Sequence, residues 1–396
     1  MKIVDLKVRT VLVPLEAPLR HSTGVHPGRF IRTILEIITD EGIVGLGEVG
    51  GGDQRAALLK LKPRIIGEDP FQLERIKQLT LKQIYYLSNP RLYAAIEIAC
   101  LDIQGKAMGR SVSDLIGGRL RDRIPFCGYL FYRYAENGVG GETSPQEIAE
   151  WATQLVDQYG FRSLKLKVGP MPPMHDVAVI RKLREVFGPS MGLRLDPNGY
   201  WSRGTAIHVA QALEECRLEY LEDPTWGLEG MARVKERTNL PLATNMCVTT
   251  FDHVAPAVAM NAVDVILADI YYWEGIRAVK ALGVICECFR WGLSMHSGTE
   301  LGITMAAMLH TCASLPNLTY DADAHYHHLL DDVIVGGKMR YDDGYLAVPS
   351  GPGLGVELDE DRMGKYVELF EKEGDYYARF HEDTRRPNWF PVNPGW

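Results

Sequence analysis

The sequence predicts an α/β protein built on a modified TIM barrel of seven to eight (β/α) units, with an N-terminal α+β capping domain that the C-terminal segment completes. Two observations predict this architecture. From about residue 124 onward, short apolar runs alternate with amphipathic stretches, which is typical of parallel strands joined by helices. Polar residues also recur at the ends of these runs at a nearly constant spacing, as expected for one rim of a barrel.

Residues 1–123 are expected to form the capping domain. Residues 1–50 are typical of a meander, with an opening strand, a polar loop over residues 18–27 and two strands joined by a tight turn, Ile31–Ile38 and Ile43–Glu48. The second of these strands contains a G-x-G-x-x-G pattern, but dinucleotide-binding sites place that pattern after the first strand of a βαβ unit. Residues 53–117 are mostly helical, because small and apolar residues recur there at helical spacing.

Residues 124–344 are expected to form the barrel. Eight apolar runs have the length of buried strands, and amphipathic helical stretches such as Ser144–Tyr159 follow most of them. The pattern then becomes hairpin-like again, and a helix and a polar tail end the chain, so residues 345–396 are expected to return to the capping domain. The predicted barrel strands are Ile124–Leu130, Phe161–Val168, Met191–Asp196, Glu219–Asp223, Pro241–Asn245, Asp264–Asp269, Gly292–His296 and Leu318–Asp323.

The composition and net charge limit the kinds of molecule that this protein is expected to bind. The net charge of −8 over 396 residues gives no reason to expect nucleic acid or an acidic membrane as a partner. No segment has the ~18 uninterrupted apolar residues of a membrane span, and the first residues lack a signal-peptide core. The seven cysteines form no paired framework, so we expect reduced thiols and a cytoplasmic protein. The expected partner is a small molecule; a homo-oligomer is compatible with the sequence, which does not specify one.

Seven polar residues stand at the ends of successive predicted strands. They are separated by 29, 26, 23, 24, 27 and 27 residues, which is the length of one βα unit. Any one of them alone would be read as a cap or a solvated charge, but seven in phase predict an active site at the carboxyl ends of the strands. The seven residues are Lys167, Asp196, Glu222, Asn245, Asp269, His296 and Asp323.

Three consecutive strands in this series end in Asp196, Glu222 and Asn245, which supply only oxygen ligands. Such a set suits a hard cation, with Mg²⁺ as the first expectation and Mn²⁺ as the alternative. Two carboxylates and a neutral amide leave the site about neutral once a divalent ion is bound. We therefore expect a substrate that brings its own carboxylate, such as a dicarboxylate or an acid sugar.

Two lysines lie two residues apart on one predicted strand, Lys165 and Lys167, so their side chains face the same side. On an exposed edge strand they would only discourage aggregation. Inside a barrel, two unit charges at ~4 Å and an effective dielectric of ~20 repel by roughly 4 kcal/mol. That repulsion would lower a lysine pKa towards neutrality, where the amine can act as a base.

Across the barrel, Asp269 and His296 end neighbouring strands and are spaced as a carboxylate–imidazole dyad, in which the aspartate fixes the histidine tautomer. A cation site between two opposed proton-transfer groups fits removal of a proton next to a carboxylate, with the resulting enediolate stabilised by neighbouring cations.

These residues, in this order, resemble the enolase superfamily and its mandelate-racemase-like branch over essentially the whole chain, and within that branch the D-glucarate dehydratase group. The segments that carry the likeness include Phe161-x-x-Leu-Lys-Leu-Lys167, Leu195-Asp-Pro-Asn-Gly-x-Trp201, Glu222-Asp-Pro224 and Ala243-Thr-Asn-Met246. The resemblance implies that Lys167 is the base and Lys165 lowers its pKa. It also implies that the three oxygen ligands bind Mg²⁺ with Asn198 beside them, and that His296, held by Asp269, acts on the other face.

The resemblance also implies substrate contacts, although Gly298-Thr-Glu300 departs from the family's asparagine-rich continuation. From the residues alone, His26 is equally well a loop histidine, Tyr129 a barrel-lining aromatic and Arg379 a solvated tail charge. His327 and His328 are expected at the surface. The implied contacts are His26, Arg32, Tyr129, Ser297, His325 and Arg379.

The leading hypothesis is a carbon–oxygen hydro-lyase. It would dehydrate an aldarate, with D-glucarate as the first expectation and galactarate as another, to a 2-keto-3-deoxy acid sugar with the help of Mg²⁺. A racemase or epimerase would use the same two opposed bases for 1,1-proton transfer. A non-catalytic barrel that binds sugar acids is the alternative outside catalysis, and a Schiff-base aldolase would need no metal ligands.

Overall fold

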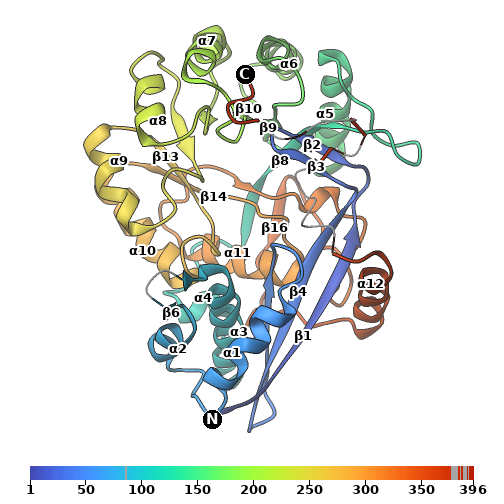
Figure 1. Ribbon diagram of the computed structural model, residues 1–396, viewed down its shortest axis with the longest axis vertical. Helices are drawn as coiled ribbons and strands as arrows, with labels where there is room; N and C mark the ends of the chain where they lie inside the picture. The colour runs from blue at the N-terminus through green and yellow to red at the C-terminus, as the bar shows by residue number, and fades with distance from the viewer. Residues whose placement is uncertain (85–86, 376–381, 384, 387–389, 391) are drawn as a thin grey trace.

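The computed structural model describes residues 1–396 except 85–86, 376–381, 384, 387–389 and 391. The chain forms two parts that lie one above the other (Figure 1): a barrel surrounded by helices, and a smaller domain built on an antiparallel sheet. The fold predicted from the sequence, a barrel with an α+β capping domain, is confirmed. No helix in the described part of the chain is long and apolar enough to cross a membrane.

The capping sheet has three antiparallel strands in the order β1 (Ile3–Pro14), β4 (Arg29–Thr39) and β5 (Val44–Val49). A Cβ on Gly45 would lie 2.1 Å from the carbonyl oxygen of Ala99, and one on Gly47 would lie 2.3 Å from that of Ala95. The glycines of the G-x-G pattern are therefore explained by close packing of β5 on the long helix α3. The remaining elements here are α1 (Arg55–Ile65), α2 (Leu73–Thr80), β6 (Lys82–Ile84), β7 (Leu87–Ser88), α3 (Pro90–Met108) and α4 (Val112–Leu115).

Eight strands form the barrel, in chain order from β8 to β14, and β15 pairs with β8 in parallel and so brings the last strand back to the first. All eight predicted strands are present. They are β8 (Arg123–Arg133), β9 (Ser163–Lys167), β10 (Gly192–Asp196), β11 (Tyr220–Glu222), β12 (Leu242–Thr244), β13 (Val265–Ala268), β14 (Gly292–Met295) and β15 (Ala322–Asp323).

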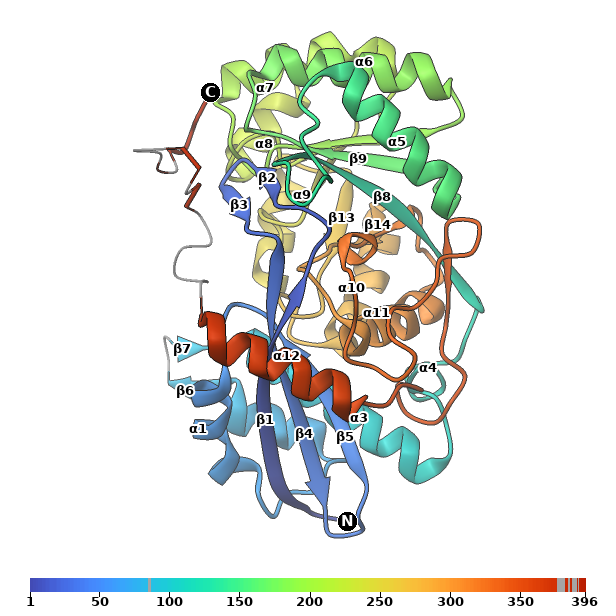
Figure 2. The same ribbon diagram turned by 90° about the vertical axis from the view of Figure 1, so that its right-hand side faces the viewer.

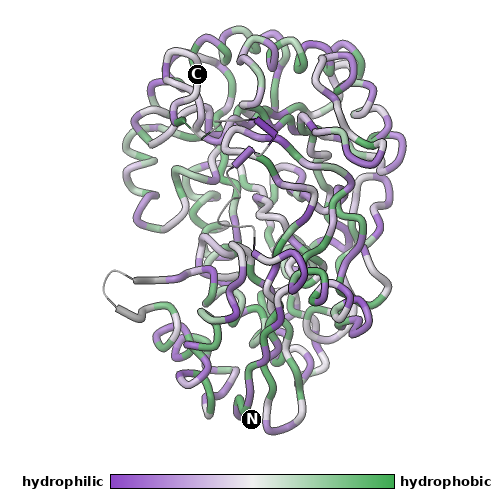
Figure 3. Tube along the Cα trace, turned by 45° about the vertical axis from the view of Figure 1, so that its right-hand side comes forward, coloured by the Kyte–Doolittle hydropathy of each residue, from purple (hydrophilic) through white to green (hydrophobic). Residues whose placement is uncertain are grey.

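The connecting helices cover the outside of the barrel. Hydrophilic and hydrophobic residues alternate along them (Figure 3), because only one side of each helix packs on the strands. In α5, a serine N-cap and a glutamate three residues later form a capping box, Ser144 and Glu147. The helices are α5 (Pro145–Tyr159), α6 (Pro173–Phe187), α7 (Arg203–Leu213), α8 (Leu228–Lys235), α9 (Val254–Met260), α10 (Ile276–Phe289) and α11 (Gly302–Ser314).

The segment expected to be a polar loop, residues 18–27, is instead a hairpin of β2 (Leu19–His21) and β3 (Gly24–His26). Its first strand pairs antiparallel with the end of β8. Three-residue strands are too short for an alternating pattern to be visible in the sequence. The hairpin carries part of the capping domain onto the rim of the barrel.

The segment after the barrel returns only in part to the capping domain. Helix α12 (Glu360–Glu373) lies along β1 (Figure 2), whereas β16 (Tyr345–Ala347) still pairs with β8 of the barrel. The described end of the tail also contacts the barrel: the Trp396 indole donates to the carbonyl of Gly169 at 3.3 Å. The expectation that residues 345–396 return to the capping domain is therefore wrong for β16 and for Trp396, which contact the barrel.

Candidate functional site

A cavity of about 360 Å³ lies at the carboxyl ends of the barrel strands, where the capping domain covers them. Both parts of the chain contribute side chains to its wall. The barrel contributes Lys167, Asn198, Asn245, Asp269, His296, Ser297 and His325, and the capping part contributes His26, Arg32 and Arg91. Four of the seven polar strand ends predicted from their spacing therefore line one cavity: Lys167, Asn245, Asp269 and His296.

Lys167 is the last residue of β9 and stands directly beside Asp196, the last residue of β10, in the parallel register. The lysine amine and the aspartate carboxylate form an ion pair, and both side chains are almost fully buried. The other oxygen of Asp196 accepts the backbone N–H of Asn198 at 2.7 Å. This turn, with Asn198 at a φ of +52°, brings the asparagine side chain to the cavity wall.

Lys165 lies one layer deeper, fully buried, and pairs with two carboxylates, those of Glu222 and Asp323. Burial opposes its charge, but the two carboxylates outweigh burial and raise the pKa of Lys165 well above its usual range. A charged Lys165 is compatible with its expected role as the neighbour that lowers the pKa of Lys167, and that role stays a prediction. The sequence argument counted only the repulsion between two lysines and missed that Asp323, from the last strand, would reach the first of them.

Two of the three predicted metal ligands carry unsatisfied oxygens. Among the described residues, one oxygen of Glu222 and the amide oxygen of Asn245 are buried without a hydrogen-bond partner. Asn245 is held in place because the neighbouring Asp223 accepts its backbone N–H at 2.9 Å. Orphaned buried oxygens of this kind fit a hard cation. Within the described ranges no three His, Cys, Asp or Glu side chains are placed as a metal site, as expected for a set of two carboxylates and one amide.

Asp269 and His296 make the expected contact: the imidazole Nδ1 lies 2.8 Å from a carboxylate oxygen of the aspartate. The other oxygen of Asp269 accepts the backbone N–H groups of Tyr271 and Tyr272 at 2.7 and 3.0 Å. Although burial acts the other way, the hydrogen bond from His296 holds the pKa of Asp269 below its usual range. The ring of Tyr272 stacks on that of His296, which fixes the imidazole plane.

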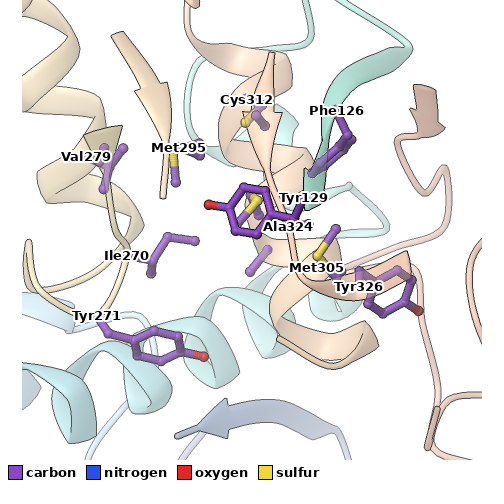
Figure 4. Close-up of a cluster of buried hydrophobic side chains, with 14 of the residues drawn as sticks. Phe126, Tyr129, Ile270, Tyr271, Val279, Met295, Met305, Cys312, Ala324 and Tyr326 are labelled. Carbon is purple, nitrogen blue, oxygen red and sulfur yellow. The ribbon is translucent and has the colours of Figure 1, made fainter. Parts of the chain in front are cut away.

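The implied substrate contacts divide into three groups. His26, Arg32, Ser297 and His325 line the cavity. Tyr129 does not: it is buried beneath the site with its ring 5.2 Å from the Lys165 amine, among residues such as Phe126 and Met305 (Figure 4). The sequence placed Tyr129 on the correct strand, β8, but its side chain lies one layer below the cavity. Arg379 lies outside the described residues.

His327 and His328 were expected at the surface, and this is wrong. Both are buried, their rings lie 4.0 Å apart, and His328 packs against Phe131 and Trp151. The short helical turn that contains them runs under the rim of the barrel. Histidine is intermediate in its tendency to be buried, so residue type alone did not show that these two side chains lie in the interior.

Sequence reasoning missed Arg91 as a wall residue. It lies in the first turn of α3, and its guanidinium donates to the Tyr272 hydroxyl at 3.1 Å and lies over that ring. A Cβ on Gly51 would come within 3.1 Å of the same guanidinium. Nothing in the sequence marks this arginine, because only the docking of the capping domain brings it to the barrel.

Comparisons with known proteins agree with this architecture. Residues 3–117 match the mandelate racemase / muconate lactonizing enzyme N-terminal domain, and residues 147–362 match the enolase C-terminal domain-like family. A probable glucarate dehydratase from Streptomyces coelicolor is 37% identical over 91% of this chain and 90% of its own.

Two further relatives are a solved structure and a racemase. An enolase from Pseudomonas fluorescens, crystallised with bound magnesium, potassium and tartrate, is 37% identical with a TM-score of 0.92 and covers 100% of this chain and 99% of its own. An N-succinyl-L-Arg/Lys racemase from Bacillus cereus is 27% identical over 92% of this chain and 97% of its own.

Proposed function

The chain belongs to the enolase superfamily, in the branch of mandelate racemase and muconate lactonizing enzyme, and on this premise we propose that it dehydrates an acid sugar, with D-glucarate as the leading substrate. The observation that carries the proposal is the pairing of two proton-transfer groups on one cavity: the Lys167 amine from β9 and the His296–Asp269 pair from β14 and the end of β13. Elimination of water needs one group to take a proton and another to give one.

The wall of the cavity also favours an acid with a second carboxylate. Arg91, Arg32 and His26 lie on the capping side, and His325 lies on the barrel side. The charge of Arg32 is already paired with buried Glu48, so Arg91 is the cation offered to the substrate. The only carboxylate among the described wall residues is that of Asp269, which is engaged by His296. A dianionic substrate therefore meets cationic and neutral donors on the side away from the metal ligands.

Asp196, Glu222 and Asn245 would hold Mg²⁺, because their oxygens are of the hard type and two of them are buried without partners. When bound, the ion would act as a Lewis acid that makes the proton next to the substrate carboxylate easier to remove. Magnesium in the Pseudomonas fluorescens relative supports this assignment.

The side chains of this protein would then divide the work. Lys167, in the neutral amine form rather than the ammonium form that pairs with Asp196, removes the proton α to the carboxylate. Nδ1 of His296 donates to Asp269, so in the imidazolium form Nε2 carries the second proton and gives it to the departing β-hydroxyl as the C–O bond breaks, which leaves a neutral imidazole. The products are water and an enol that tautomerises to a 2-keto-3-deoxy acid. The cover provided by the capping domain keeps bulk water from the reacting atoms.

The test is incubation of the Mg²⁺-loaded protein with D-glucarate, galactarate and other aldarates, with an assay for 2-keto acid. A Lys167→Ala variant should lose about 10³-fold in turnover, since a positioned base contributes roughly 10²–10⁴. Lys182→Ala is the matched control, because that lysine pairs with Glu185 on the outside of α6 and is remote from the site. Absence of 2-keto acid from every aldarate would refute the proposal.

A second candidate is a racemase or epimerase, and one observation favours it: two opposed groups line the same cavity, and a relative carries a racemase name. In deuterated buffer, a racemase would incorporate deuterium at the α-carbon without forming 2-keto acid. Thermal stabilisation by aldarates with neither exchange nor turnover would instead indicate a sugar-acid-binding barrel.

A further inference from the structure

Glu300 is a buried carboxylate behind the cavity wall, with a side chain 2% exposed. One of its oxygens accepts the hydroxyl of Ser297 at 2.6 Å, and the other accepts the backbone N–H of Gly298. The Ser297 oxygen also lies 2.7 Å from Nδ1 of His325 and accepts the backbone N–H of that residue at 3.0 Å. A continuous hydrogen-bonded chain therefore runs from Glu300 through the serine to an imidazole on the cavity wall.

With Glu300 as a carboxylate, proton accounting along this chain leaves one arrangement. An ionised carboxylate can only accept, so the single hydroxyl proton of Ser297 points to Glu300. The serine oxygen is then an acceptor towards His325, and Nδ1 of that ring must carry the proton. In a neutral imidazole the remaining nitrogen, Nε2, keeps its lone pair.

The surroundings keep the ring neutral. Burial lowers the pKa of His325 well below its usual range, and the neighbouring His26, Lys167, His296 and His327 act in the same direction. Burial also raises the pKa of Glu300, although the Ser297 hydroxyl, the Arg32 charge and backbone N–H groups oppose this. We take Glu300 as the carboxylate from geometry, because its two oxygens accept the Ser297 hydroxyl and the Gly298 N–H.

We propose that Glu300 is a positioning residue that acts through Ser297 to fix His325 as the Nδ1–H tautomer, so that Nε2 offers an acceptor to the cavity. This nitrogen selects a substrate that places a hydroxyl donor there, and it discriminates against a carboxylate or a carbonyl, which offer only lone pairs. The identification of that donor as a hydroxyl of an acid sugar rests on the proposed function. The assignment of the His325 tautomer does not rest on the proposed function.

The first test reads the tautomer in the ligand-free protein by ¹⁵N NMR of labelled histidine, with the His325 signals assigned by their loss in His325→Gln. The wild type should show Nδ1–H and bare Nε2. In Glu300→Gln the amide oxygen stays on the Gly298 N–H, so the NH₂ group faces Ser297 and turns the serine proton towards His325. The tautomer should then switch to Nε2–H. Wild-type signals of the Nε2–H form, or no switch in the variant, overturn the proposal.

Two further variants separate positioning from general damage. Ser297→Ala cuts the chain and should leave His325 as a mixture of tautomers, which keeps the test available if Glu300→Gln does not fold. Glu97→Gln also changes a buried glutamate, but at the join between α3 and α10, so it should leave the His325 signals unchanged. A change in those signals in Glu97→Gln would show that they report general loosening and would overturn the assignment.

The second test measures selectivity by calorimetric titration of the Mg²⁺-loaded protein with tartrate, which has hydroxyls, and with succinate, which lacks them. The wild type should prefer tartrate, and Glu300→Gln should reduce that preference about five- to tenfold, the usual effect of one hydrogen bond. An unchanged preference despite a switched tautomer overturns the role in selectivity. Loss of dehydratase activity in every assay, with the tautomer as stated, would count against the proposed function alone.

Discussion

Buried carboxylates occur in two regions of this protein, and the two regions differ in what donates to them. At the rim of the barrel each carboxylate has one side-chain donor that can gain or lose a proton, and Asp196 and Asp269 accept backbone N–H groups as well. At the join between the capping domain and the barrel the donors are mostly backbone N–H groups. The rim pairs are Asp196 with Lys167, Glu222 with Lys165 and Asp269 with His296.

At the join, Glu48 accepts the backbone N–H groups of Leu301 and Thr304, both at 2.9 Å, at the start of α11. Asp102 accepts those of Leu46 and Leu354, at 2.9 and 2.8 Å, and so ties the capping helix α3 to the segment that returns after the barrel. It also pairs with the Lys106 amine at 2.6 Å, on the same helix. A backbone amide cannot release its proton at ordinary pH, so these backbone contacts serve to hold parts of the chain together. The same residue type thus serves structure or chemistry according to its donor.

The largest expected effect on stability is at Glu48. This residue also forms an ion pair with Arg32, and both side chains are at most 2% exposed. Glu48→Gln should lower the free energy of unfolding by about 3–5 kcal/mol, because it leaves the arginine charge buried without a counter-charge. Urea unfolding measures this loss.

Glu36→Gln is the matched control on the same sheet, since Glu36 pairs with Arg9 in a partly exposed position. That variant should change the free energy of unfolding by less than about 1 kcal/mol. Equal losses in the two variants would contradict the contrast between buried and exposed pairs.

The opposite behaviour is expected at the rim. Asp269→Asn should reduce turnover about 100-fold, because an amide can present its NH₂ group to His296 and no longer fixes the Nδ1–H tautomer. Its melting temperature should change little compared with that of Glu48→Gln. Turnover is measured by 2-keto acid formation, and a variant that melts early but retains its activity per folded molecule would place Asp269 with the structural carboxylates.

The rim could be predicted from the sequence because a barrel repeats. Each βα unit adds a similar number of residues, so the polar residues at the strand ends, from Lys167 to Asp323, recur at a regular spacing. That spacing allows them to be recognised in the sequence as one set. The pattern gives the position of each side chain along its strand. It does not give what reaches it from across the barrel, which is why the pairing of Lys165 with Asp323 was missed.

The capping side of the cavity could not be predicted in the same way. Arg91 comes from a helix, and His26 from a hairpin whose strands have three residues each. No spacing rule links them, because a rigid docking of two domains brings them together. Glu300 is visible in the sequence only as a departure from a family pattern. Its role depends on hydrogen bonds that the fold alone specifies.

The smallest expected effect is a pH dependence of the free energy of unfolding that arises from Glu97. It is also the sharpest test of the join between the capping domain and the barrel. This side chain of α3 is buried, accepts the Tyr93 hydroxyl at 3.2 Å and lies 3.5 Å from the backbone nitrogen of Arg277 at the start of α10. Burial raises the pKa of Glu97 to about 7, against an ordinary value of 4.5, although the Arg277 charge opposes this.

Between pH 4.5 and 7 the folded protein therefore binds a proton at Glu97 that the unfolded chain has released. By linkage, the contribution of this group to stability is full below pH 4.5, falls as the pH rises towards 7 and is constant above it. Glu97→Gln has no such dependence. The unfolding free energy of the variant should rise relative to that of the wild type by roughly 2 kcal/mol between pH 5 and 8.

Urea unfolding at several pH values measures the difference, and Glu150→Gln on the exposed side of α5 is the control that should show no trend. A gap between wild type and Glu97→Gln that stays constant with pH would mean that Glu97 is ionised throughout. The join would then hold a buried charge, as the rim does, and the distinction between carboxylates that meet side-chain donors and those that meet backbone donors would fail at this residue.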